Sequence, residues 1–137
     1  MFKIRHAIEL DKTFWFSLDE HISKDEFMLK IRDKRGYIIC DDDKPIGIMR
    51  YNLFWDNTPF LNSIGIVESH QGQGFGTQAM KHWESEMQSM GHSLVMTSTQ
   101  ADEQAQHFYR KLGYRDSGCL LLRDDPAEIF FVKYFEA

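Results

Sequence analysis

The clearest chemical signal in the sequence is a glycine-rich segment, Gln71-Gly72-Gln73-Gly74-Phe75-Gly76-Thr77. Glycine lets the backbone approach a ligand closely and adopt positive φ angles. A helix that begins directly afterwards would offer unpaired N–H groups and the positive end of its dipole. Together these features favour the binding of a phosphate or a pyrophosphate. A strand-to-helix turn that binds nothing is the alternative interpretation.

Two common phosphate-binding motifs do not fit this segment. A Walker A loop requires a lysine directly after its last glycine, and no glycine of the segment is followed by lysine. The dinucleotide fingerprint GxGxxG requires glycine at position 77, where the chain has Thr77. The pattern that fits is Q/R-x-x-G-x-G/A, satisfied by Gln71, Gly74 and Gly76. Because this pattern is short, it needs support from elsewhere in the chain.

Support comes from a second segment, in which the pattern A-x-x-F/L-Y-x-K-x-G-F/Y is satisfied by Ala105, Phe108, Tyr109, Lys111, Gly113 and Tyr114. Together the two segments resemble the GNAT superfamily of acyl-CoA-dependent N-acetyltransferases. The two motifs stand in the order and at the spacing of that family. The resemblance covers essentially the whole chain, because the expected order of strands and helices also matches.

The periodicity of apolar residues predicts the elements that position these segments. We expect strands over residues 2–7, 37–40, 46–54, 60–67, 93–99, 119–122 and 129–135. We expect helices over residues 10–34, 79–90 and 101–112, the first broken near Ile22, with Ser23 as the N-cap of its second part. Gly36, Gly91 and Gly113 are expected to end helices. This order predicts one α/β (α+β) domain over residues 1–137, a mixed, mostly antiparallel sheet of about six to seven strands flanked by about four helices.

Composition and charge narrow the class of protein further. The chain has 137 residues, of which 42% are hydrophobic, and a net charge of −5, which argues against nonspecific nucleic-acid binding. No apolar run approaches the ~20 residues of a membrane span. Cys40 and Cys119 form no CxxC pair, and the histidines lack metal-ligand spacing. We therefore expect a cytoplasmic protein with no nucleic-acid or membrane partner and no metal.

The resemblance implies acetyl-CoA as the cosubstrate. By analogy with the family, its pantetheine arm and pyrophosphate would contact Ile64, Ile66, Val67, Gln71, Gly72, Gln73, Gly74, Phe75, Gly76, Thr77, Asp102, Phe108, Tyr109 and Lys111. The chain departs from the family where Gln71 and Gln73 replace common basic residues, and where Asp102 replaces a helix-starting asparagine. The pyrophosphate would then depend on backbone donors and the helix dipole.

The resemblance also implies direct transfer of an acetyl group to an amine. Tyr109 would protonate the departing thiolate, since a phenol of pKa about 10 is a competent donor to a thiolate whose conjugate acid has a pKa near 8.5. The alternative is that Tyr109 only contributes to the apolar stripe of its helix. A backbone N–H near Ile66 would polarise the thioester carbonyl. No general base is assigned. The nearby polar groups are Asp56, Glu68 and His70, and a water molecule bound to Asn62 could equally accept the proton.

The acceptor side is expected around the connection of residues 52–60. Trp55 and Phe60 would form an apolar wall, Asp56 would attract a cationic amine, and Asn62 follows on the next strand. Burial of these aromatics in the core or in a homodimer interface is the alternative. The function predicted is acetyl transfer to a primary amine of a small molecule or peptide. A noncatalytic acyl-CoA-binding module or sensor, and a nucleotide-dependent phosphotransferase, are the competing predictions.

Overall fold

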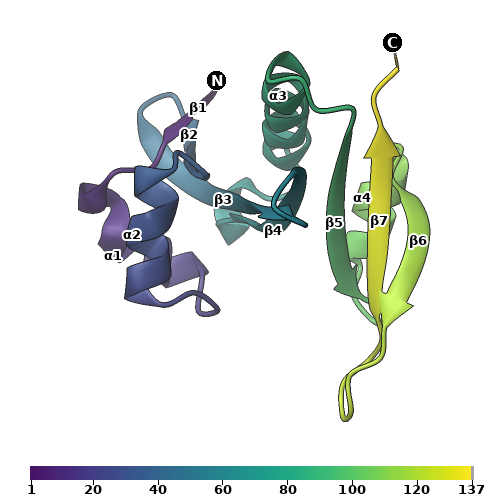
Figure 1. Cartoon of the computed structure of the whole chain (residues 1–137). Coiled ribbons are helices and arrows are strands. Elements are labelled where there is room, and N and C mark those ends of the chain that lie inside the picture. The colour runs from purple at the N-terminus through teal and green to yellow at the C-terminus, as the bar shows by residue number, and fades with distance from the viewer. Residues whose placement is uncertain (137) are drawn as a thin grey trace. The chain divides into compact units, whose positions relative to one another are not determined.

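The structure, a computed structural model, describes residues 1–136 and arranges seven strands in the order β1-β2-β3-β4-β5-β7-β6 (Figure 1). The strands are β1 (Phe2–His6), β2 (Gly36–Asp41), β3 (Lys44–Phe54), β4 (Thr58–Ile66), β5 (Leu94–Gln100), β6 (Arg115–Leu120) and β7 (Glu128–Tyr134). The α-helices are α1 (Lys12–Leu18), α2 (Lys24–Arg32), α3 (Phe75–Ser89) and α4 (Ala105–Lys111). None of the helices in the described residues is long and apolar enough to cross a membrane.

Most of the strand pairs are antiparallel. This holds for β1 with β2, β2 with β3, β5 with β7 and β6 with β7, whereas β4 and β5 run parallel. The predicted fold class is therefore confirmed. The chain forms two compact units, one of Met1–Asn52 with Asn62–Trp83, the other of Leu53–Leu61 with the chain from Glu84 onward.

Three predicted boundaries are wrong. Gly36 does not end a helix, because α2 ends at Arg32 and Gly36 is the first residue of β2. The strand predicted over residues 119–122 lies at Arg115–Leu120, since pairing with β7 fixes it there and the next two leucines belong to the exposed connection. The helix predicted from residue 101 begins at Ala105, with Gln104 as its N-cap.

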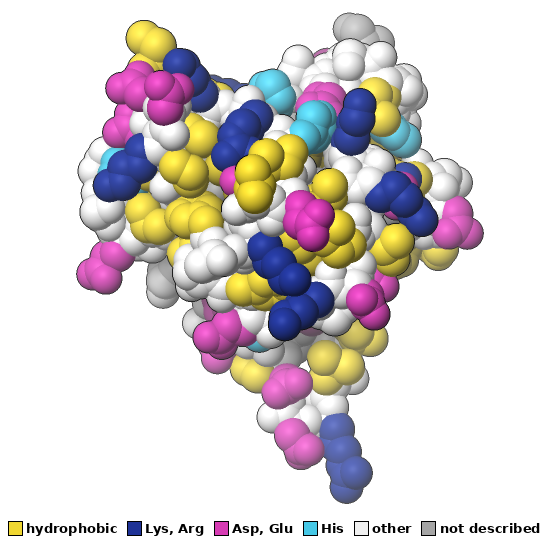
Figure 2. Space-filling view, turned by 90° about the vertical axis from the view of Figure 1, so that its left-hand side faces the viewer, with side chains coloured by type: hydrophobic (Ala, Val, Ile, Leu, Met, Phe, Trp, Pro, Cys, Tyr) yellow, Lys and Arg dark blue, Asp and Glu magenta, His cyan; other side chains and the backbone are white. Residues whose placement is uncertain are grey.

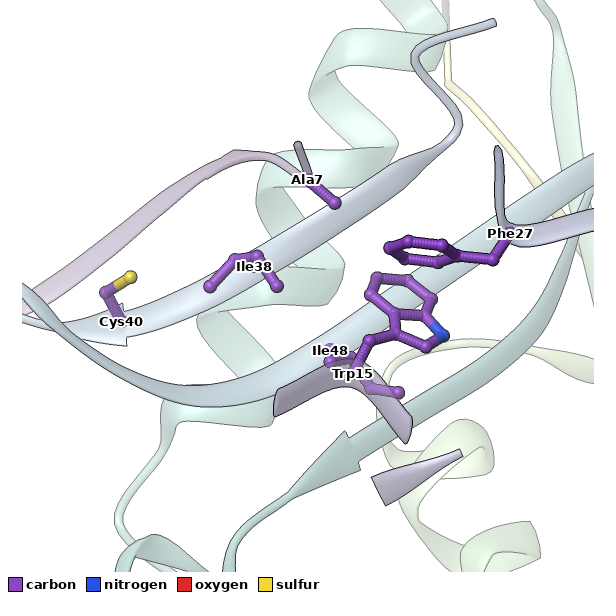
Figure 3. Packing of buried hydrophobic residues seen from close by; sticks show 6 residues of the cluster. All are labelled: Ala7, Trp15, Phe27, Ile38, Cys40 and Ile48. Atoms are coloured by element: carbon purple, nitrogen blue, oxygen red, sulfur yellow. The ribbon is translucent and has the colours of Figure 1, made fainter. Parts of the chain in front are cut away.

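The core of the first unit forms where α1 and α2 pack on the strands. Figure 3 shows its six residues, Ala7, Trp15, Phe27, Ile38, Cys40 and Ile48. The Trp15 and Phe27 rings lie 5.2 Å apart between centroids, so the two helices bury large aromatic surfaces against each other. The predicted N-cap of α2 is confirmed, because Ser23 Oγ accepts a hydrogen bond from the Glu26 N–H at 3.1 Å.

A buried ion pair anchors the segment between α1 and α2 to the sheet. Asp19, the C-cap of α1, is 2% exposed, and its Oδ2 accepts hydrogen bonds from Arg50 Nε at 2.7 Å and Trp15 Nε1 at 3.2 Å. Burial alone would raise the pKa of Asp19, but the hydrogen bonds from Arg50, the His21 N–H and Trp15 outweigh burial and lower it. The carboxylate therefore remains charged and ties the helix break to β3.

In the second unit, a carboxylate of α3 joins two other segments. Glu84 accepts hydrogen bonds from the Tyr114 hydroxyl and from Lys133 Nζ of β7, each at 2.8 Å. Burial and the adjacent carboxylate raise the pKa of Tyr114 far above its ordinary value, so its hydroxyl stays a donor. Lys133 satisfies the second carboxylate oxygen, and this buried polar cluster is thereby paired.

Replacing Asp19 by asparagine is expected to lower the free energy of unfolding by about 3 kcal/mol at pH 7, because Arg50 would keep a nearly buried charge without its partner. Since the folded-state pKa of Asp19 is lowered, its stabilisation is present above the unfolded-state pKa near 3.9 and is lost as the pH falls through the folded-state pKa. Urea unfolding at pH 7 and pH 3 measures both effects. Asp33→Asn, which removes a surface partner of Arg32, is the control and should leave stability nearly unchanged.

Candidate functional site

The glycine-rich segment forms a tight turn between a short 3-10 helix, Glu68–His70, and the start of α3 at Phe75. Gly72 has a φ of 73° and Gly74 a φ of 90°, in the region that favours glycine. A Cβ placed on either residue would meet no atom within 4 Å. Open space therefore adjoins the turn at the N-terminus of a 15-residue helix, an arrangement that suits an anionic ligand.

The two glutamines of the turn bond to nearby backbone. Gln71 Nε2 donates to the Ile66 carbonyl at 2.9 Å, and Gln73 Nε2 donates to the Ser69 carbonyl at 3.1 Å. The two neutral side chains thus stabilise the turn through hydrogen bonds to nearby backbone carbonyls. Figure 2 shows basic, acidic and hydrophobic side chains interspersed on one face of the molecule, so the charge on that face has mixed sign.

Asp41 and His70 form a hydrogen bond beside this turn that the sequence did not indicate. His70 Nε2 lies 3.2 Å from Asp41 Oδ2 of β2, and its Nδ1 lies 2.8 Å from Ser69 Oγ. The His70 ring also contacts the ring of Phe75 edge-on, with 5.6 Å between centroids. Asp41 and His70 are far apart in the sequence, so only the fold reveals the pair. It connects β2 to both ends of the turn.

The end of β4 leads directly into the turn, and a close backbone approach constrains it. A Cβ on Gly47 of β3 would lie 2.7 Å from the Gly65 carbonyl oxygen and 2.7 Å from Ile66 Cδ1. Val67, just beyond the strand, donates its N–H to the Ile46 carbonyl at 2.8 Å. Gly47 is therefore required where β3 meets the residues implied for the pantetheine arm. Ile64, Ile66 and Val67 are half-buried there.

In the second unit, Tyr109 of α4 is 5% exposed and lies among aromatic rings. Its ring centroid is 5.8 Å from that of Tyr114 and 5.9 Å from that of Phe131. Burial raises the pKa of Tyr109, and the Thr97 side chain opposes part of this shift. The phenol is therefore protonated at neutral pH, as a proton donor must be.

The other predicted residues around α4 differ in exposure. Phe108 is half-buried and its ring contacts that of Tyr109, with 5.4 Å between centroids, whereas Lys111 is exposed. Asp102 is exposed in the turn before the helix and is not its N-cap. Gln106 Nε2 instead stabilises the turn before the helix, since it donates to the Ala101 and Glu103 carbonyls at 2.8 Å each.

The residues predicted for the acceptor divide between the two units. Trp55 is 79% exposed, and both Trp55 and Asp56 have positive φ angles, 56° and 65°. The Phe54 ring links Trp55 to Phe60, at centroid distances of 4.7 and 5.9 Å. Asn62 belongs to the first unit, where its Nδ2 donates to Asn52 Oδ1 at 2.7 Å. The structure thus joins Trp55 and Phe60 in one aromatic cluster.

These features agree with the comparison against protein families. The family model described as "Acetyltransferase (GNAT) family" matches residues 4–114. The chain belongs to this family. The resemblance inferred from the two motifs is confirmed, and an N-acetyltransferase is the class of enzyme that it supports. No match to a curated protein sequence was found.

Solved structures, GNAT acetyltransferases among them, share the fold. A GNAT acetyltransferase from Bacillus cereus ATCC 10987 is 20% identical with a TM-score of 0.79, and the match covers 100% of this chain and 99% of that one. Ard1 from Thermoplasma volcanium is 15% identical, with a TM-score of 0.85 and 99% of both chains covered. A GNAT acetyltransferase from Elizabethkingia anophelis, solved with acetyl-CoA bound, is 15% identical, with a TM-score of 0.78 and 98% of both chains covered.

Replacing Gly47 by alanine is expected to destabilise the protein by about 1–3 kcal/mol, because the new methyl group must displace the Gly65 carbonyl and Ile66. The displacement should also weaken binding of acetyl-CoA, since it moves the end of β4. Thermal unfolding and titration calorimetry measure the two effects. Gly65→Ala is the control for stability, because its Cβ would meet only Ile48 Cγ1, at 3.9 Å. Equal losses of stability in both variants would contradict the close approach.

Proposed function

We propose that the chain transfers the acetyl group of acetyl-CoA directly to a primary amine of a small molecule or peptide. The observation that carries this proposal is the turn before α3, where Gly72 and Gly74 have positive φ angles and face open space. Backbone N–H groups of this turn and of the first turn of α3 would hold the pyrophosphate, aided by the helix dipole. The acetyl-CoA complex of the Elizabethkingia anophelis relative supports this cosubstrate.

The reaction divides three tasks among the chain's own groups. The amine nitrogen attacks the thioester carbon after losing a proton, and the carbon–sulfur bond then breaks. The backbone N–H of Ile66 would stabilise the oxyanion, and the hydroxyl of Tyr109 would donate its proton to the departing thiolate. The nitrogen loses a second proton as the amide forms, which restores the protonated phenol. No residue is assigned as the base for the first proton.

A noncatalytic acyl-CoA-binding protein remains the second candidate. Tyr109 packs among aromatic rings in the way a purely structural residue would, which is the observation that favours this candidate. Thiol release from acetyl-CoA, measured against a panel of amines and peptide N-termini, separates the two candidates. Mass spectrometry of the product would identify the acetylated amine. An enzyme releases thiol in step with acetylated product, and a sensor releases neither.

Replacing Gly74 by alanine is expected to abolish the stabilisation that acetyl-CoA gives. Alanine at a φ of 90° is strained by about 1 kcal/mol, and its methyl group would occupy the space proposed for the pyrophosphate. For the unchanged protein, acetyl-CoA at 100 times its Kd should add about 2.7 kcal/mol, read as a rise in Tm.

Gly91→Ala is the matched control for this variant. Gly91 follows α3 with a φ of 95° and also has no atom within 4 Å of an added Cβ. It should therefore lose similar stability while keeping the full shift with acetyl-CoA. If both alanine variants respond fully to acetyl-CoA, the pyrophosphate does not bind at this turn.

Replacing Tyr109 by phenylalanine is expected to lower kcat on the order of 100-fold or more while leaving the affinity for acetyl-CoA nearly unchanged. Steady-state kinetics and calorimetry measure the two quantities. Tyr114→Phe removes a neighbouring buried hydroxyl that is bound to Glu84, and it should reduce stability without reducing kcat. A Tyr109 variant that keeps its kcat would remove the proton-donor role and favour the noncatalytic candidate.

A further inference from the structure

One carboxylate of the second unit lies beside apolar rings on a sheet face that α4 does not cover. Glu128, the first residue of β7, accepts a hydrogen bond from Ser98 Oγ of β5, with 2.6 Å between the two oxygens. Both side chains are half-buried. The hydroxyl holds one carboxylate oxygen, Oε2, in a fixed position. The carboxylate retains accepting capacity for a further donor.

The alternation of β5 places this pair on the face away from α4. Val95, Thr97 and Thr99 are buried, whereas Ser98 lies between two of them and points to the opposite face. Figure 1 shows α4 behind β5 and β7, and Tyr109 of α4 interacts with Thr97. Ser98 therefore faces away from the helix that carries the proposed proton donor, one residue from Thr97.

Aromatic rings continue the same face beside the carboxylate. Phe130 is the direct cross-strand partner of Ser98, and it stands two residues from Glu128 on β7. Its ring meets that of Phe60 edge-on, with 6.0 Å between centroids. Phe60 and Phe130 are both half-buried, so each ring keeps surface that an apolar group can cover.

The face also lies next to the point where β4 and β5 pair. Phe60 pairs with Met96 and Leu61 with Thr97, and Thr97 Oγ1 donates to the Leu61 carbonyl at 3.0 Å. Ser98 is the next residue along β5. The carboxylate and the two aromatic rings thus lie together on one face of the second unit, beside the pairing of β4 with β5.

We propose that Glu128 binds the ammonium group of the acceptor, that Ser98 orients its carboxylate, and that Phe60 and Phe130 bind the apolar body of the acceptor. This inference rests on the proposed acetyl transfer and specifies its substrate class, a monoamine that carries an apolar or aromatic group. A charge-assisted hydrogen bond fixes the ammonium end, and burial of the apolar end excludes strongly polar amines. Because a monoamine has one nitrogen, the nitrogen bound to Glu128 is the one that loses a proton and attacks the thioester carbon. The neutral amine keeps an N–H donor for the carboxylate, so Glu128 is a binding residue and takes no part in bond breaking.

Steady-state kinetics with 2-phenylethylamine, ethanolamine and spermidine test the proposal. The unchanged protein is expected to acetylate 2-phenylethylamine with a kcat/KM about 30-fold or more above that of ethanolamine, because only the former covers the rings. Glu128→Gln keeps an acceptor for the Ser98 hydroxyl and removes the charge. It is expected to raise the KM for 2-phenylethylamine on the order of 10-fold or more, with kcat and acetyl-CoA affinity nearly unchanged.

Two further variants test whether a change in KM comes from amine binding at Glu128 or from the loss of any negative charge near Tyr109. Ser98→Ala keeps the charge of Glu128 but removes the hydrogen bond that orients its carboxylate. The KM for 2-phenylethylamine should therefore rise by a smaller factor than in Glu128→Gln. Glu103→Gln removes another carboxylate that interacts with Tyr109, from an exposed turn, and it should leave the KM for the amine unchanged. An unchanged amine KM in Glu128→Gln, or a preference for spermidine, ethanolamine or peptide amines, would overturn the proposal.

The same experiment distinguishes failure of this inference from failure of the proposed function. If the unchanged protein acetylates none of the amines and no peptide N-terminus, the proposed transfer itself is wrong. If it acetylates an amine and Glu128→Gln behaves like Glu103→Gln, only the role of Glu128 is wrong. Binding of acetyl-CoA, followed by thermal shift in every variant, confirms that each protein is folded.

Discussion

The close approach of β3 and β4 at Gly47 is the constraint on which the position of the glycine turn in the first unit depends. Because no side chain fits between Gly47 and the Gly65 carbonyl, the end of β4 has one position against β3. The Val67 N–H bound to the Ile46 carbonyl and Gln71 bound to the Ile66 carbonyl carry that position forward into the glycine turn. Two glycines with positive φ then direct the chain into α3. A backbone contact, not a charged side chain, therefore determines the position of the glycine turn.

The neutral glutamines of the turn have a consequence for charge. A protein with a net charge of −5 repels a multiply charged anion over long distances, so attraction must come from short-range donors. Backbone N–H groups and a helix dipole supply such attraction without cationic side chains. Gln71 and Gln73 instead stabilise the turn before any ligand binds. A prearranged turn loses less conformational entropy on binding, which offsets part of the missing charge.

Local patterns in the sequence predicted the fold class and the glycine turn well, because both depend on residue type and periodicity. The Ser23 cap and the break after α1 were predicted for the same reason. The boundary of β6 was wrong because an apolar run suggested a strand, whereas pairing with β7 decides the register. Ser98 with Glu128, and Asp41 with His70, could not be predicted, since each pair joins segments about 30 residues apart through strand placement. The register between strands that are distant in the sequence cannot be predicted from either segment alone.

Burial of Tyr109 affects both partners in the proposed proton transfer. Desolvation disfavours the phenolate and raises the pKa of the tyrosine, which by itself weakens it as an acid. A thiolate that departs into the same apolar surroundings is also desolvated, and the pKa of its conjugate acid rises too. The driving force depends on the difference between the two pKa values, so shared burial preserves much of it. Thr97 opposes part of the shift on the tyrosine alone, which makes the phenol the better donor. Aromatic packing around Tyr109 is therefore compatible with acid catalysis.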